Sequence, residues 1–181
     1  PQIQMGRDYE AVLIEYRKFP HLEFLIRNNI LKLGSNWSFT VVCGNINYDF
    51  IVSICNSISD NIKIIKTNYD NLFVDSYSLF LASKDFWNMF HGSKILIYQE
   101  DSIIFKSTIN DFIHWDYIGA PWPKTQNDNP YGVGNGGFSL RTKQCMIDVI
   151  DKISIENTEC NSSTKMYMKN CKLNVVPEDV Y

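Results

Sequence analysis

Residues 11–43 read AVLIEYRKFPHLEFLIRNNILKLGSNWSFTVVC, and the order of apolar patterns along them indicates the fold class. It begins with the mostly apolar run Ala11–Tyr16, which is typical of a buried β-strand. Apolar residues then recur at helical spacing over Leu22–Leu33, and Gly34 stands where that helix should end. A second apolar run, Phe39–Cys43, follows. The order strand, helix, strand predicts a βαβ unit with parallel strands.

The same alternation continues toward the C-terminus. Two further apolar runs, Ile62–Lys66 and Lys94–Tyr98, are typical of strands, and helical spacing predicts one helix over 50–58 and one or two over 72–90. Beyond these we expect a short strand at Ile103–Phe105, a helix over 146–153, a helix or loop over 158–170 and a final strand at Leu173–Val176. The aromatic residues Phe80, Phe86, Trp87 and Phe90 are expected in the core. These patterns predict a single α/β domain with a mostly parallel sheet flanked by helices.

Composition excludes several classes of protein. The chain has 181 residues and a formal net charge of −3, from 17 basic and 20 acidic residues, so it lacks the basic character of a dedicated nucleic-acid binder. Its apolar runs are too short to span a bilayer, so we expect no transmembrane segment, no signal peptide and a cytoplasmic location. The first residue is not methionine and Tyr181 directly follows a PEDV segment, so we expect a domain from a longer protein.

The cysteines indicate reduced thiols. They are odd in number, scattered along the chain and never spaced as C-x-x-C, which argues against a disulfide scaffold or a zinc site. We expect most of them to fill the core. They are Cys43, Cys55, Cys145, Cys160 and Cys171.

Acidic residues follow the predicted strand at Lys94–Tyr98. In open α/β sheets ligands bind at the carboxyl ends of the strands, where Glu15, Tyr16 and Arg17 and then Gln99, Glu100 and Asp101 lie. Carboxylates at a buried sheet edge need a cationic partner, and a hard cation such as Mg²⁺ or Mn²⁺ on substrate phosphates would supply one. A plain polar turn between two strands explains the same residues equally well.

A glycine-rich segment, GVGNGGFSLR over 132–141, follows the aromatic segment DYIGAPW over 116–122. Closely spaced glycines allow the backbone to approach a ligand, although a surface turn also explains them. The segment matches neither the P-loop nor the dinucleotide-binding pattern. Aromatic faces beside exposed backbone amides suit a sugar, so Trp122, Gly134, Asn135, Gly136 and Gly137 are candidate sugar or acceptor contacts.

A third segment, PEDV over 177–180, has two possible roles. Proline followed by two acids can simply begin a helix, where the helix dipole favours negative charge. Alternatively, one carboxylate acts as a general base that takes a proton from an acceptor hydroxyl.

Taken together, these segments resemble a little-characterised family of glycosyltransferase-like domains with bacterial, fungal and large DNA virus members. The resemblance rests on EYR at 15–17, YQEDS at 98–102, DYIGAPW at 116–122, GNGGFSLR at 134–141 and PEDV at 177–180. It implies a GT-A-like, Rossmann-like fold that binds a nucleotide-sugar such as a UDP-sugar. For a viral member, the expected location is the host cytoplasm.

The resemblance also implies roles for particular residues. Asp101 matches the last acid of a D-x-D-type motif that holds Mn²⁺ or Mg²⁺ on the donor diphosphate, but Gln99 stands where the first aspartate would be. On an extended strand, Glu100 would point away from Asp101. Glu15, Tyr16, Arg17 and Gln99 are the implied donor contacts.

Glu178 and Asp179 match the acidic pair that supplies the base in inverting members, and we favour Asp179. The acceptor would be a hydroxyl of a glycan, a protein or a small molecule. Two other functions stay open. One is a degenerate glycan-binding or scaffold module, which the presence of Gln99 in place of the first motif aspartate favours. The other is a nucleotidyltransferase, which would release pyrophosphate.

Overall fold

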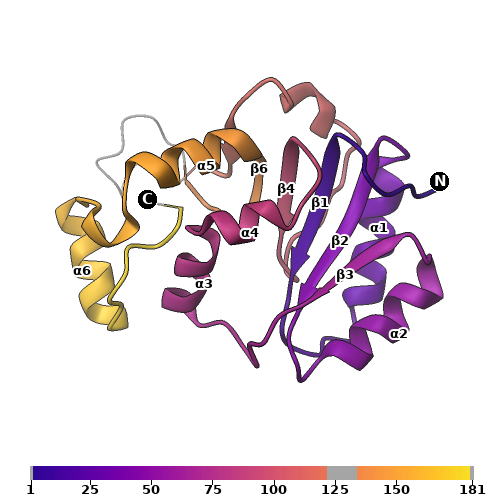
Figure 1. The fold of residues 1–181 in the computed structure, drawn as a ribbon, viewed down its shortest axis with the longest axis horizontal. Helices are drawn as coiled ribbons and strands as arrows, with labels where there is room; N and C mark the ends of the chain where they lie inside the picture. Colours follow the sequence, from indigo (N-terminus) through magenta and orange to yellow (C-terminus); the bar gives the residue numbers. More distant parts are fainter. Residues whose placement is uncertain (1, 122–133, 180–181) are drawn as a thin grey trace.

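The computed structural model describes residues 2–121 and 134–179 (Figure 1). Six strands of this described part form one sheet, in the order β3-β2-β1-β4-β6-β5. Strands β1 to β4 are parallel, whereas β6 runs antiparallel to both β4 and β5. The strands are β1 (Tyr9–Ile14), β2 (Trp37–Cys43), β3 (Ile62–Lys66), β4 (Lys94–Tyr98), β5 (Tyr117–Gly119) and β6 (Phe138–Thr142).

Helices cover both faces of the sheet, and alternate residues of each strand enter two separate cores. Leu13 and Leu96 face the helices α1 and α2, whereas Val12 and Ile97 face α3, α4 and α5. Helix α6 lies at the end of the molecule opposite α2 (Figure 1). The helices are α1 (Leu22–Leu33), α2 (Tyr48–Ile58), α3 (Val74–Leu81), α4 (Lys84–Asn88), α5 (Lys143–Lys152) and α6 (Ser162–Cys171), with 3₁₀ turns at Ile109–Phe112 and Ile155–Asn157.

The predicted mostly parallel α/β sheet is confirmed, and so is the buried position of the aromatic cluster in α3 and α4. All five cysteines are free thiols, but only Cys43 and Cys55 are buried, so the expectation that most fill the core is wrong. Burial raises the pKa of Cys43 to about 11 and that of Cys55 to about 12, which keeps both thiols protonated. No helix in the described ranges has the length and apolar character needed to cross a membrane.

Two predicted strands are wrong. Ile103–Phe105 is a loop that buries Ile104 in the core, and the Ile104 carbonyl accepts a hydrogen bond from the Asn28 side chain at 3.0 Å. Residues 173–176 form no strand because the backbone N–H groups of Asn174 and Val175 donate to the Asp75 carboxylate instead of to a neighbouring strand. In both segments, side chains form the hydrogen bonds with backbone groups that a neighbouring strand would form in a sheet.

The antiparallel strand β6 determines where the site forms. Its first residue, Phe138, pairs with Tyr98, the last residue of β4. The glycine-rich segment just before β6 is therefore brought to the carboxyl ends of β1 and β4. The segments that follow parallel strands all lie at the same edge of the sheet. Because β6 runs in the opposite direction, the segment that precedes β6 lies at this edge as well.

Candidate functional site

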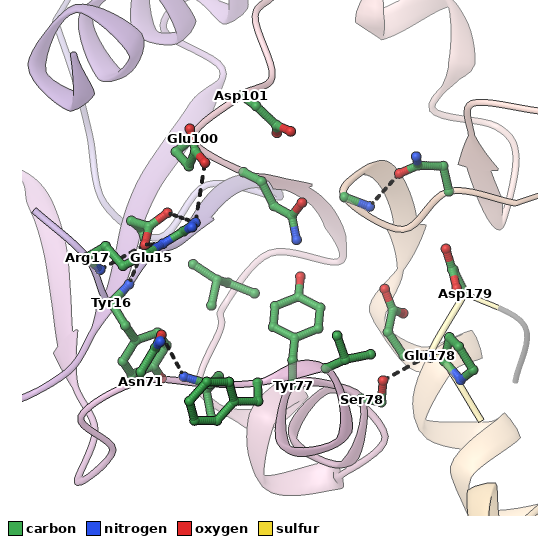
Figure 2. Close-up of a pocket in the computed structure, with 18 of the residues that line it drawn as sticks. Glu15, Tyr16, Arg17, Asn71, Tyr77, Ser78, Glu100, Asp101, Glu178 and Asp179 are labelled. Atoms are coloured by element: carbon green, nitrogen blue, oxygen red, sulfur yellow. Dashed lines mark hydrogen bonds and ion pairs between the residues drawn. The ribbon is translucent and has the colours of Figure 1, made fainter. Parts of the chain in front are cut away.

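A cavity of about 1090 Å³ opens at this edge of the sheet (Figure 2). Its walls come from the ends of β1 and β4, the glycine-rich segment, α3, α6 and the C-terminal segment. We call it the main cavity. It is lined by Ile14–Arg17, Asn71–Val74, Tyr77, Ser78, Gln99–Asp101, Asn135, Gly137, Ser163, Thr164, Tyr167 and Pro177–Asp179.

One wall of the main cavity is an exposed guanidinium held by a buried carboxylate. Glu15 accepts hydrogen bonds from the Nε and Nη2 atoms of Arg17 at 2.8 and 2.9 Å, and from the backbone N–H groups of Tyr16 and Arg17. The Glu15 side chain is 3% exposed, whereas that of Arg17 is 54% exposed. The hydrogen bond to Glu15 raises the pKa of Arg17. The fixed guanidinium remains accessible to an anionic ligand.

The two acids after β4 point in different directions (Figure 2). Glu100 lies 3.3 Å from Arg17 Nη2 and 3.3 Å from His21 Nε2, so its carboxylate is already paired. Asp101 is exposed, and within residues 2–121 and 134–179 its carboxylate accepts one hydrogen bond, of 3.4 Å, from the neighbouring Ser102 hydroxyl. The carboxylate of Asp101 is therefore free for a cation.

The donor set suits a cation that also binds substrate. Within the described ranges no three His, Cys, Asp or Glu residues are grouped to hold a metal ion by themselves. Mg²⁺ and Mn²⁺ nevertheless bind through one or two carboxylates when phosphates supply other oxygen ligands. The exposed carboxylate oxygens of Asp101 fit that arrangement. The Glu100 carboxylate is not available as a metal ligand, because it contacts Arg17 and His21.

The glycine-rich segment packs too closely for side chains. A Cβ atom on Gly136 would overlap the Glu178 carboxylate, and one on Gly137 would overlap the Gln99 amide. The Asn135 side chain accepts a hydrogen bond from the Gly137 N–H at 2.9 Å. These two positions require glycine because the segment is clamped between the end of β4 and the C-terminal acids.

A buried ion pair lies behind this segment. Arg141 of β6 donates to Glu178 through Nη1 at 2.7 Å and through Nη2 at 3.0 Å, and the two side chains are 3% and 7% exposed. Arg141 also donates to the Ser139 hydroxyl and the Gly136 carbonyl. Burial by itself lowers the pKa of Arg141, but the charge and hydrogen bonds of Glu178 outweigh it, and the pKa is raised.

Asp179, in contrast, forms no ion pair with any residue in the described part of the chain. It accepts a hydrogen bond of 3.3 Å from the Gly136 N–H. Burial and the charge of Glu178 raise the pKa of Asp179 above its ordinary 3.8. A partly buried carboxylate with a raised pKa, placed on a cavity wall, is suited to accept a proton.

Helix α3 contributes a residue that the sequence did not reveal. The hydroxyl oxygen of Tyr77 is buried at the cavity, and burial raises its pKa. It interacts with the Gln99 amide, yet no described residue completes a hydrogen bond of normal geometry with it. Phe73 and Tyr167 also line the cavity, from the start of α3 and from α6. In the sequence, these three aromatic residues look like ordinary core residues of helices. Nothing in the sequence therefore distinguishes them as site residues.

The structure brings most of the predicted site residues to one cavity. Those that line it are Glu15, Tyr16, Arg17, Gln99, Asp101, Asn135, Gly137, Glu178 and Asp179. Gly136 contacts Asp179, and the Gly134 carbonyl accepts a hydrogen bond of 2.7 Å from Tyr117. Trp122 lies outside the described residues. Asp101, Asn135 and Asp179, which come from three separate segments, thus share one opening.

Comparison with known proteins agrees with this fold. Residues 61–181 match a family described as "Protein of unknown function (DUF5672)", and the chain belongs to that family. No curated protein matches it in sequence. A mannosyltransferase from Pyrobaculum calidifontis, PcManGT in complex with GDP-Man and Mn²⁺, is similar in structure with a TM-score of 0.57 at 8% identity, over 78% of this chain and 46% of that one.

Two further solved structures are similar. One is 4-diphosphocytidyl-2C-methyl-D-erythritolsynthase from Anaerococcus prevotii, with a TM-score of 0.56 at 8% identity, over 94% of this chain and 86% of that one. The other is TarS 1-349 from S. aureus, with a TM-score of 0.55 at 12% identity, over 94% and 56%. The chain spans about half the length of the mannosyltransferase and of TarS. At these identities the likeness shows the fold, which is that of GT-A glycosyltransferases and related nucleotidyltransferases.

Proposed function

We propose that this member of the DUF5672 family is a glycosyltransferase that moves a sugar from a nucleotide-sugar to an acceptor hydroxyl with inversion. The observation that carries the proposal is the free carboxylate of Asp179 on the wall of the same cavity that Arg17 and Asp101 line. A transferase of this type needs a base at one side of the reacting carbon and charge stabilisation at the other. The GT-A-like fold supports the proposal.

The charge of the main cavity supports a metal-assisted donor site. Five carboxylates line it, and Arg17 is the one cationic side chain among its described lining residues. A diphosphate would be repelled by this surface unless a cation accompanied it. When bound to Asp101 and the diphosphate, Mn²⁺ or Mg²⁺ would neutralise charge on the leaving group. Arg17 is placed to donate hydrogen bonds to the same phosphates.

The contacts of the C-terminal acids separate their roles. Glu178 is committed to the buried pair with Arg141, so protonating it would leave a buried guanidinium without its partner. Asp179 has no such commitment, and its raised pKa makes proton uptake easier. We therefore assign the base to Asp179 and a positioning role to Glu178.

The proposed step is a single displacement. Asp179 takes the proton of the acceptor hydroxyl, and the acceptor oxygen bonds to the anomeric carbon of the donor sugar. The bond between that carbon and the diphosphate breaks, and its electron pair leaves with the nucleoside diphosphate. Arg17, which Glu15 orients, would donate hydrogen bonds to the departing diphosphate, and Asp101 would hold the cation that neutralises it. Asn135 and the segment Gly134–Gly137 would line the path of the sugar.

Substitution of Asp179 tests this assignment. Asp179→Asn should lower turnover of an accepted nucleotide-sugar by about 10²–10⁴-fold, the usual contribution of a general base, while nucleotide binding persists. The assay is release of nucleoside diphosphate from a panel of donors, UDP-sugars first, with and without Mn²⁺. Glu159→Gln, an exposed acid outside the cavity lining, is the matched control. Full turnover by Asp179→Asn, or a retained anomeric configuration in the product, would contradict the mechanism.

A nucleotidyltransferase is the second candidate, favoured by the likeness to the synthase from Anaerococcus prevotii, most of whose length the chain covers. The same assay separates the two functions, because a nucleotidyltransferase releases pyrophosphate rather than a nucleoside diphosphate. Donor binding without release of either product would instead identify a binding module.

A further inference from the structure

A second, smaller cavity of about 190 Å³ lies against the proposed base. We call it the side cavity. Its wall contains six apolar side chains, from the end of α3, α4 and α5: Leu81, Ala82, Trp87, Met146, Val149 and Ile150. Glu178 and Asp179 line both this cavity and the main cavity, so the C-terminal acids are shared by the two.

Helix α5 leaves its apolar side only partly covered. Met146, Val149 and Ile150 are half-buried, and α5 has no fully buried residue within the described structure. The helix packs against α4 (Figure 1), yet a space remains between α5 and the turn after α3. Apolar side chains that line a cavity this close to a reactive carboxylate are a favourable surface for an apolar part of a ligand.

The polar atoms of the side cavity restrict what it can accept. The guanidinium of Arg141 is satisfied by Glu178, Ser139 and Gly136, so it offers little charge to a ligand. Asp179 adds a negative charge that forms no ion pair with a described residue, and this charge disfavours an anionic ligand. A sugar ring would lose hydrogen bonds to water for its hydroxyls against the apolar wall, whereas a hydrocarbon ring would not.

We infer that the side cavity binds an uncharged hydrocarbon ring of the acceptor, with the hydroxyl that receives the sugar facing Asp179. The inference rests on the proposed function and adds the acceptor class: an alcohol joined to a single aromatic or aliphatic ring. A cavity of about 150 Å³ lined by apolar side chains accommodates benzene, so a space of about 190 Å³ suits one ring.

Benzyl alcohol is the probe, because it joins one ring to one hydroxyl. Binding to the whole chain is followed by the methyl resonances of Met146, Val149 and Ile150 in NMR spectra. We expect saturable shifts of these methyl groups. Benzoate, which has the same ring and a negative charge, should bind about tenfold more weakly or worse. If the methyl resonances show no saturable shifts, or if benzoate binds as tightly as benzyl alcohol, the inference is overturned. This test uses only the wild-type chain.

Filling the side cavity provides a second test. Val149→Phe should weaken benzyl alcohol binding by about tenfold or more, because the added ring occupies the space. The matched control is Val52→Phe in α2, a half-buried valine on the opposite face of the sheet. Both variants are checked for cooperative unfolding. Unchanged binding by a folded Val149→Phe would overturn the inference.

Donor turnover by the wild-type chain, with water as the acceptor, separates the two proposals. Turnover without benzyl alcohol binding overturns the side-cavity inference alone. Benzyl alcohol binding without turnover of any donor supports the side cavity as a ligand site and counts against the transferase. Faster donor consumption when benzyl alcohol is added supports both.

Discussion

The site contains two arginine–glutamate pairs in which both glutamates are buried but only one of the arginines is exposed. Arg17 and Glu15 join at 2.8 Å with the guanidinium 54% exposed, whereas Arg141 and Glu178 join at 2.7 Å with both side chains almost completely buried. An exposed guanidinium can turn its remaining donors to a ligand at little cost, because water still solvates it. A buried one cannot change partners without leaving an unpaired charge. Burial therefore assigns the first pair to ligand contact and the second to holding the cavity together.

The largest difference between the pairs should appear in stability. Arg141→Met leaves the Glu178 carboxylate buried and unpaired, and we expect the free energy of unfolding to fall by about 3–5 kcal/mol. Arg17→Met should cost less, because the Arg17 side chain is 54% exposed and the buried Glu15 carboxylate keeps its hydrogen bonds from the backbone N–H groups of Tyr16 and Arg17. Urea denaturation measures both. The double variant Arg141→Met with Glu178→Leu should recover much of the loss, and equal losses in the two single arginine variants would break the comparison.

The exposed carboxylate of Asp101 should determine how tightly the site binds a divalent cation. Asp101→Asn removes the one carboxylate at the end of β4 that is not already paired, so the Mn²⁺ concentration needed for UDP binding should rise by about tenfold. Thermal unfolding with UDP and increasing Mn²⁺ reports this, since ligand binding raises the unfolding temperature. Glu100→Gln is the control, because its carboxylate faces Arg17 and His21. An equal effect of both variants would contradict a specific role for Asp101.

The exposed guanidinium should matter for donor affinity rather than for folding. Arg17→Met should weaken UDP binding in Mn²⁺ by about tenfold, the value expected for a lost hydrogen bond to a charged group. Calorimetric titration measures the affinity. Arg27→Met removes a similarly exposed arginine that pairs with Glu23 on α1, away from the main cavity. If both variants bind UDP as the wild type does, Arg17 is not a donor contact.

The smallest effect concerns the pH dependence of stability. The pKa of Asp179 is raised in the folded state, so between pH 3.8 and the folded pKa the folded chain holds a proton that the unfolded chain has released. Ionised Asp179 therefore destabilises the fold at neutral pH, and this penalty is lost as the pH falls through the folded pKa. Asp179→Asn should raise the free energy of unfolding at neutral pH and flatten its pH dependence just above pH 3.8. Lower stability of this variant at pH 7 would contradict the assignment.

The sequence predicted the parallel half of the sheet because β1 to β4 carry strong local signals. Their apolar runs bury side chains on both faces, and the helices between them show clear periodicity. Strand β6 gave no such signal, because its FSLR residues include Ser139 and Arg141. Arg141 is buried because Glu178 of the C-terminal segment pairs with it, and the Ser139 hydroxyl is satisfied by the nearby Gly136 carbonyl and Arg141. Ile103–Phe105 and Leu173–Val176 look apolar enough for strands, yet side chains of distant residues satisfy their backbone.

Some residues of the site could likewise be predicted from the sequence, and others could not. The segments at 15–17, 99–101, 134–137 and 177–179 could be selected from the sequence, because polar residues and glycines follow strands or interrupt apolar runs. Tyr77 and the side cavity could not, since they depend on how α3, α4 and α5 pack. The contrast between Glu178 and Asp179 was equally hidden, because adjacent acids look alike until one of them meets Arg141.

Local periodicity in the sequence therefore indicates strands β1 to β4, the helices between them and the chemical groups at the strand ends, because periodicity and turn chemistry depend on near neighbours. Which charges are buried, which carboxylate is paired and which space stays open are set by packing between distant segments. Those properties depend on residues that are far apart in the chain, and the cost of burying a charge is set by everything that surrounds it.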